Sequence, residues 1–243
     1  MPVFVCKFNK NYELFLSHVY KYIITNFAQD FNLSSLRRIE IVDSLPGLSD
    51  GRMVDANTIL LSKRLYDLLS TFDIKLLKND DNFNSIVGTL YHELCHINEQ
   101  TIMPNIHSIC YNNDEIDMEY CTALFWIEYI VELKTNKVLK RNKDKFCNDV
   151  ASCEWNIDKF NFEDDDTSNY FYLIKVLPYV LASCCNNRNS SYFDSIKNTS
   201  VKNVAIELNN AVLESSREYP FDDINKLHKI KTVLLTYKYQ MVG

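Results

Sequence analysis

Five consecutive residues, His92 to His96, form the HExxH motif His-Glu-Leu-Cys-His. Residues four apart on a helix project from the same face, with their Cβ atoms about 5–6 Å apart. Two imidazoles placed in this way can bind one zinc ion at about 2.0–2.1 Å. Glu93 lies about 100° further around the helix, so it points beside the metal, where a carboxylate can take a proton from an activated water. The motif predicts a zinc site with His92 and His96 as ligands and Glu93 as the catalytic base.

The apolar surroundings of the motif argue against a chance match. The chain has five His in 243 residues, and simple arithmetic on such a motif gives roughly 0.007 accidental matches per chain. Ile86, Val87 and Leu90 precede the motif at helical spacing, with no proline to interrupt the helix. The competing interpretation is a pair of histidines on a solvated helix face.

A catalytic zinc ion usually takes a third protein ligand. The glycine and third histidine of the longer HExxHxxGxxH pattern are absent. Glu128 is the best candidate, since it lies in the apolar run LFWIEYIVEL and a metal would offset the cost of burying its carboxylate. Alternatively, Glu128, Glu132 and Thr135 form an exposed polar stripe. Glu132 and His107 are the other candidate ligands, whereas Cys95 inside the motif is interpreted as a packing residue.

The elements that must position these residues follow from hydrophobic periodicity. Strands are predicted at residues 2–8, 37–43 and 53–62, and helices at 11–31, 63–77, 83–100, 114–139, 170–185, 200–217 and 222–240. A turn is expected at 44–51 and a loop around Pro104. This order predicts an α+β fold with a small mixed sheet packed by helices. The acidic stretch 161–169 suggests a boundary between a domain at 1–160 and a helical C-terminal region at 161–243 packed on it. The alternative is one continuous domain.

Composition narrows the classes of function. The net charge of −6 makes the chain a poor generic binder of nucleic acid, and no glycine-rich nucleotide-binding loop is present. Neither a signal peptide nor an apolar run long enough to span a membrane is apparent. The eight cysteines include no CxxC pair. We therefore expect a cytoplasmic protein with reduced thiols, and no membrane partner.

The two segments YHELCHINEQ and WIEYIVELKTNK resemble gluzincins, zinc peptidases that combine HExxH with a glutamate on a later helix. The resemblance covers roughly residues 36–140, and the second segment is similar to the Glu-Tyr-x-Ala-x-Arg pattern of small bacterial and phage-associated gluzincins. It implies a zincin-like fold and Glu128 as the third zinc ligand. The chain departs from the pattern at Val131, Glu132 and Lys134. A metal-binding imidazole commonly donates its other N–H to a carboxylate, a role open to Glu132.

The expected activity is hydrolysis of a peptide or protein substrate with Zn²⁺ as cofactor. The resemblance also implies that the strand at Thr58–Ser62 forms the sheet edge and pairs with extended substrate. Candidates for stabilising the reaction's oxyanion are Tyr111, Tyr120, His107 and His228. Two other functions are open: a non-catalytic zinc-binding regulatory module, and a metal-free helical protein with a chance HExxH.

Overall fold

The computed structural model describes residues 1–46, 49–55, 57–77, 80–111, 117–139, 174–183, 192–195 and 199–242. The described chain is mixed α+β, with a small sheet and mostly helical content. It divides into two compact units, Met1–Thr101 and Ile102–Gly243. The boundary that the sequence predicts at residues 160/161 lies outside the described residues.

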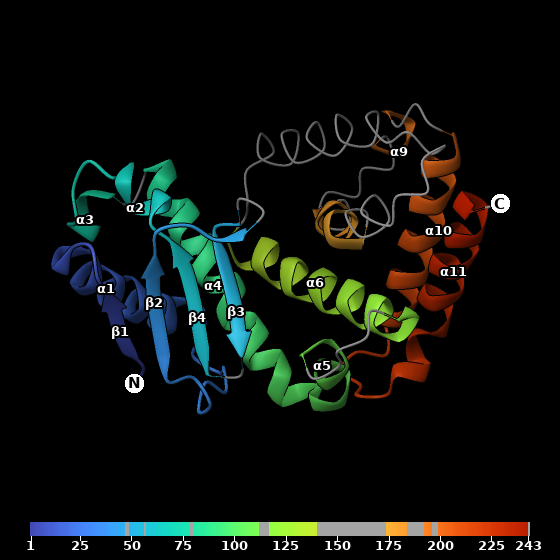
Figure 1. The fold of residues 1–243 in the computed structure, drawn as a ribbon, viewed down its shortest axis with the longest axis horizontal. Helices are drawn as coiled ribbons and strands as arrows, with labels where there is room; N and C mark the ends of the chain where they lie inside the picture. The colour runs from blue at the N-terminus through green and yellow to red at the C-terminus, as the bar shows by residue number, and fades with distance from the viewer. Residues whose placement is uncertain are drawn as a thin grey trace. The chain divides into compact units, whose positions relative to one another are not determined.

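The first unit contains a four-stranded sheet in the order β1-β2-β4-β3 (Figure 1). The strands are β1 (Val3–Cys6), β2 (Arg38–Val42), β3 (Gly51–Asp55) and β4 (Thr58–Ser62). β2 pairs in parallel with both β1 and β4, whereas β3 pairs with β4 in antiparallel orientation. β4 is therefore an inner strand, and the expectation that Thr58–Ser62 forms the sheet edge is wrong: β3 lies at that edge.

The single strand predicted at 53–62 is two strands, because the chain reverses between them. The carboxylate of Asp55 accepts a hydrogen bond from the backbone N–H of Asn57 at 2.7 Å. Such a local side-chain bond gives the backbone an alternative to the ladder and favours a turn. β3 consequently folds back onto β4, with a register shift between Met53 and Asp55.

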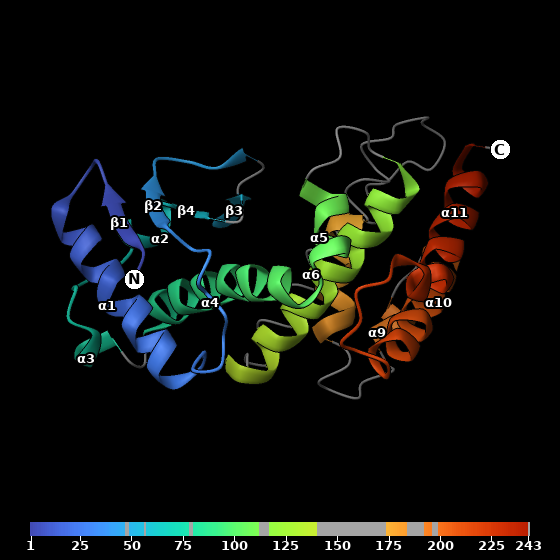
Figure 2. The same cartoon turned by 90° about the horizontal axis from the view of Figure 1, so that it is seen from below.

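Two long helices, α1 (Lys10–Asn26) and α4 (Asp81–Ile102), lie on the same face of this sheet (Figure 2). Asn9 caps α1 by accepting from the backbone N–H of Asn11 at 2.9 Å, and Asp80 caps α4 by accepting from Phe83 at 3.0 Å. Nearly every residue of α4 from Ile86 to Glu99 is buried. The apolar surroundings of the HExxH motif thus come from a helix buried on all sides.

The helix predicted at 63–77 is instead two short helices, α2 (Arg64–Asp67) and α3 (Ile74–Leu77). Between them, Thr71 accepts a hydrogen bond from the backbone N–H of Asp73, and Asp73 in turn accepts from that of Lys75. These side chains compete with the helical hydrogen bonds and break the helix.

In its described residues, the second unit forms helices and no strand. Its elements are α5 (Pro104–Tyr111), α6 (Met118–Leu139), a helix at 174–183, α9 (Tyr192–Ser195), α10 (Thr199–Ser216), η2 (Ile224–Leu227) and α11 (His228–Val242). Contacts join α6 to α5 and to α11, and α10 to α11. The indole of Trp126 on α6 stacks on the ring of Phe221, which precedes η2, with 5.3 Å between the ring centroids. This contact packs α6 against the segment before η2.

The loop predicted around Pro104 is the helix α5. Proline at the first helical position is compatible with a helix, since its missing N–H would have no intrahelical partner there. The carboxylate of Asp222 accepts hydrogen bonds from the next two backbone N–H groups, Asn105 at 2.9 Å and Ile106 at 3.0 Å. Within the described ranges, no helix is both long and apolar enough to cross a membrane.

Candidate functional site

The HExxH histidines lie on one face of α4, and both are buried. The imidazoles of His92 and His96 are 7% and 3% exposed, so the interpretation of a solvated pair is wrong. Their Nε2 atoms are 3.2 Å apart, and the rings meet edge to face with centroids at 4.9 Å. Tetrahedral zinc with Zn–N bonds of 2.0–2.1 Å would hold two such nitrogens about 3.3 Å apart. The pair therefore fits a zinc ion without rearrangement of the helix.

Glu93 is also buried, with 6% of its surface exposed. Its carboxylate lies close to the backbone at Gly51, the first residue of the edge strand β3. A Cβ atom at residue 51 would be 2.8 Å from Oε1 of Glu93 and 2.7 Å from Cγ2 of Thr89. Glycine leaves room for this close approach of the carboxylate to the start of the edge strand.

Glu128 lies on α6 and is half-buried. Its Oε2 accepts a hydrogen bond of 2.7 Å from the hydroxyl of Tyr179, in the helix at 174–183. Further along α6, Glu132 is 1% exposed and Thr135 is fully buried. The polar face of α6 is thus covered, and the proposed exposed stripe is wrong.

Cys110 on α5 lies close enough to Glu128 for an electrostatic interaction between the two side chains. Burial raises the pKa of the Cys110 thiol, and the negative charges of Glu128 and then of Cys121 raise this pKa further. A nucleophilic or metal-bound cysteine needs a lowered pKa. Cys110 is therefore a neutral packing residue beside the carboxylate.

One group of His, Cys, Asp and Glu side chains in the described part of the chain offers three ligand atoms within 4.8 Å of one another. Its members are His92, His96 and Glu128, the three ligands that the sequence predicts. Glu132, His107 and Cys95 are not members of this group. The donor set of two imidazole nitrogens and one carboxylate oxygen is one that zinc accepts in catalytic sites.

The candidate oxyanion-stabilising residues are distributed over three helices. His107 and Tyr111 stack on each other in α5, with ring centroids 5.7 Å apart, and Tyr120 lies on α6. His228 begins α11 and is exposed, with Nδ1 3.2 Å from the backbone carbonyl of Asn225. The oxyanion role of each residue stays a prediction.

Sequence reasoning missed Tyr179 and misread Gly51. The segment that contains Tyr179 resembles no known motif, and its partner Glu128 lies 51 residues earlier in the chain. Gly51 was expected only as a turn residue. The chain has only four glycines in 243 residues. This scarcity is the one feature of the sequence that indicates a specific role for Gly51.

Comparisons of this chain with protein-family models, with curated proteins and with solved structures give no match.

Proposed function

We propose that this protein is a zinc-dependent peptidase with a zincin-like fold of the gluzincin type, in which His92, His96 and Glu128 bind the metal. The observation that carries the proposal is the 3.2 Å separation of two buried imidazole nitrogens on one helical face. Two buried imidazoles at this spacing are a typical chelate for zinc. The grouping of a carboxylate oxygen of Glu128 with them supplies a donor set of the right kind.

Zinc, when bound, polarises a carbonyl group and lowers the pKa of a water from about 15.7 toward about 7. Glu93 is the base in this proposal: it accepts a proton from the attacking water and delivers that proton to the leaving amine. Its position one residue after His92 aims it beside the two imidazoles. The carboxylate lies close to the backbone at Gly51, and a base held near the site of reaction favours proton transfer.

We place the substrate, an extended peptide, along the edge strand β3. An edge strand presents backbone N–H and C=O groups that an added strand can pair with. β3 begins at Gly51, directly beside Glu93, so a peptide bound along this strand would bring a scissile bond close to the base. This support comes entirely from residues of the first unit.

The substitution Glu93→Gln tests the proposal, because glutamine keeps the size of the side chain and cannot act as a base. We expect the variant to bind zinc as the wild type does and to lose hydrolysis of a peptide library by at least about 100-fold. Zinc content is measured by elemental analysis and cleavage by mass spectrometry. Glu207→Gln, on the exposed face of α10, is the matched control and should cleave normally.

Two results would contradict the proposal in different ways. A wild-type protein that binds zinc but cleaves no peptide, with no change in Glu93→Gln, would favour a non-catalytic zinc-binding module. A wild-type protein that holds far less than one zinc per chain after reconstitution would instead favour a metal-free helical protein.

A further inference from the structure

The carboxylate of Glu128 is held by a residue from a distant part of the chain. Tyr179 donates a hydrogen bond of 2.7 Å to Oε2 of Glu128. A hydroxyl that donates to a carboxylate forms a charge-assisted bond, which is stronger than one between neutral groups. A carboxylate has about four lone-pair sites, so this bond leaves capacity for a cation.

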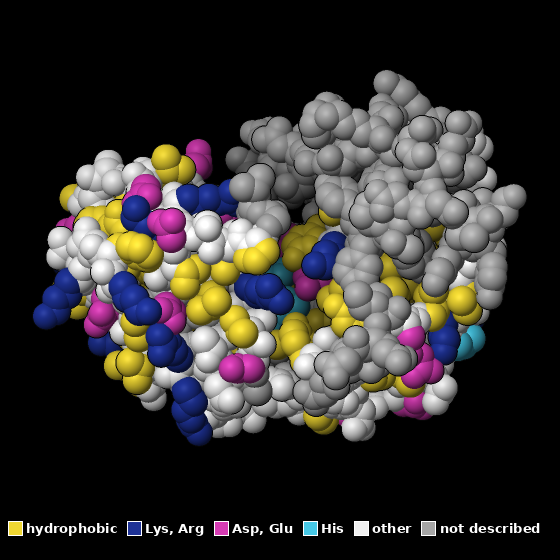
Figure 3. Space-filling view, in the orientation of Figure 1, with side chains coloured by type: hydrophobic (Ala, Val, Ile, Leu, Met, Phe, Trp, Pro, Cys, Tyr) yellow, Lys and Arg dark blue, Asp and Glu magenta, His cyan; other side chains and the backbone are white. Residues whose placement is uncertain are grey.

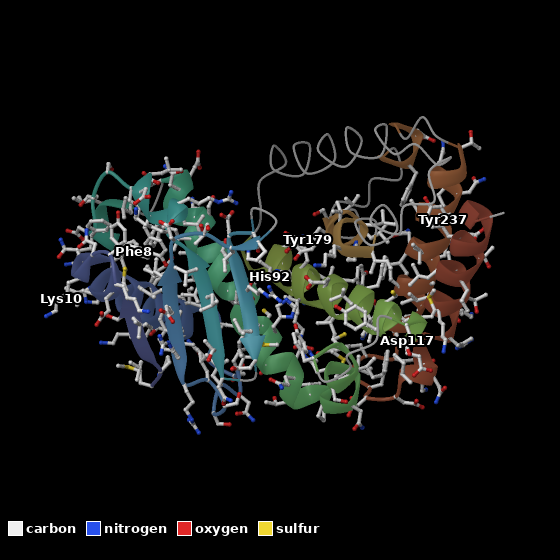
Figure 4. The ribbon with its side chains drawn as sticks, viewed as in Figure 1. Phe8, Lys10, His92, Asp117, Tyr179 and Tyr237 are labelled. Carbon is white, nitrogen blue, oxygen red and sulfur yellow. The ribbon has the colours of Figure 1, made fainter. Side chains whose placement is uncertain are left out.

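A second contact fixes the helix that carries Tyr179, the residue labelled in Figure 4. Asn136, about two turns beyond Glu128 on α6, donates from Nδ2 to the hydroxyl of Ser183 at 3.2 Å. That hydroxyl donates in turn to the backbone carbonyl of Tyr179 at 2.9 Å. The helix at 174–183 is therefore attached to the polar face of α6 at two points, which fixes the position of the Tyr179 hydroxyl.

We infer that Tyr179 is a positioning residue that holds Glu128 in the orientation required to bind zinc. Glutamate has three rotatable side-chain bonds, and ordering it at the moment of metal binding would cost conformational entropy. The hydrogen bond from Tyr179 orders the carboxylate in advance. This inference rests on the proposed zinc site, and it gives the C-terminal helices a part in that site which the sequence does not indicate.

The test is the zinc affinity of Tyr179→Phe, measured by competition with a chromophoric chelator. Partners that orient metal ligands typically contribute 10–100-fold to metal affinity, so we expect the dissociation constant to rise by about 10-fold or more. Tyr219→Phe is the matched control: its hydroxyl makes a hydrogen bond of the same length, 2.7 Å, with Lys134 in the same unit. We expect Tyr219→Phe to bind zinc as the wild type does.

A double-mutant cycle shows whether Tyr179 acts through Glu128. In a Glu128→Gln background, Tyr179→Phe should cause little further loss of affinity, since the charged acceptor is already absent. Thermal unfolding of each zinc-free variant, followed by circular dichroism, shows whether it has folded.

Three outcomes would overturn the inference. If Tyr179→Phe binds zinc within about two-fold of the wild type, the positioning role is wrong, while the proposed function stands. If Tyr219→Phe weakens binding equally, the effect is general destabilisation and the inference fails. If the wild type itself binds no zinc, the proposed function and this inference fail together.

Discussion

Glu93 lies close to the backbone at Gly51, and this makes residue 51 sensitive to substitution. A methyl group at Gly51 would be 2.8 Å from Oε1 and 3.0 Å from Cγ of Glu93. A Cβ atom almost never lies within 3.0 Å of another heavy atom, so the carboxylate would have to move away from the 2.8 Å contact. A displacement of about 1 Å in a catalytic group can cost about 100-fold in rate.

We therefore expect Gly51→Ala to lower kcat/KM for peptide hydrolysis by about 10–100-fold while leaving zinc affinity within a few-fold of the wild type. Steady-state kinetics and chelator competition measure the two effects separately. Because the added methyl would also meet Thr89 at 2.7 Å, Thr89→Ser is combined with it. Full rescue of activity in the double variant would show that Thr89, not Glu93, accounts for the loss.

Among individual residues, the sequence predicted those with distinctive chemistry. It did not predict the residues that contact and position them. HExxH and an isolated glutamate in an apolar run are visible as patterns, and the structure groups His92, His96 and Glu128. Tyr179 and Gly51 are ordinary residue types, whose importance depends on neighbours that only the folded chain supplies. A single sequence contains no record of those neighbours.

At the scale of elements, periodicity predicted α1, α4, α6, α10 and the strands β1 and β2 at nearly their observed positions. It failed where side chains bond to nearby backbone, as at Asp55 before β4 and at Asp73 before α3. It also failed at α5, whose N-terminal cap comes from Asp222, 117 residues later in the sequence. Short elements with few apolar residues are set by such bonds more than by hydrophobic pattern.

The cap of α5 yields a prediction about stability. Asp222→Ala removes the acceptor for the N–H groups of Asn105 and Ile106, so we expect a loss of about 1–2 kcal/mol in the free energy of unfolding. Urea denaturation of the full chain measures it. Asp194→Ala is the control, because the 77% exposed side chain of Asp194 forms a surface ion pair with Lys202. A surface pair of this kind should contribute less than about 1 kcal/mol. Equal losses in the two variants would contradict the assigned cap.

At the scale of the whole molecule, the two compact units were not apparent from composition. The first unit ends at Thr101, one residue before the end of α4, and α5 begins at Pro104. The sequence there has no linker rich in glycine, serine or charged residues.

On the face drawn in Figure 3, Lys and Arg side chains are interspersed with Asp and Glu side chains over the unit that contains the sheet. The cytoplasmic location and the peptide nature of the substrate stay predictions.

The proposed zinc site predicts that zinc stabilises the full chain. A ligand that binds only the native state at 100 times its dissociation constant adds about 2.7 kcal/mol of stability. For a chain of this size, that corresponds to a rise in Tm of about 5–10 °C. Differential scanning calorimetry with zinc and with excess chelator measures the rise.

The histidines supply a matched pair of variants for this measurement. We expect His92→Ala to abolish the zinc-dependent rise in Tm, since it removes one of the two proposed imidazole ligands. His18→Ala changes an exposed histidine on α1 and should leave the rise intact. If both variants keep the full rise, zinc is stabilising the chain from some other place.

The two edge strands of the sheet, β1 and β3, differ in how well they resist pairing between copies of the chain. β3 carries the charged residues Arg52 and Asp55, and charged side chains on an edge strand disfavour aggregation between copies of a chain. β1 has the uncharged sequence VFVC, and Val3 within it is 64% exposed. In concentrated solution, intermolecular strand addition should therefore begin at β1, away from the border where we place the substrate. Oligomers formed in this way would leave the proposed substrate-binding edge at β3 open.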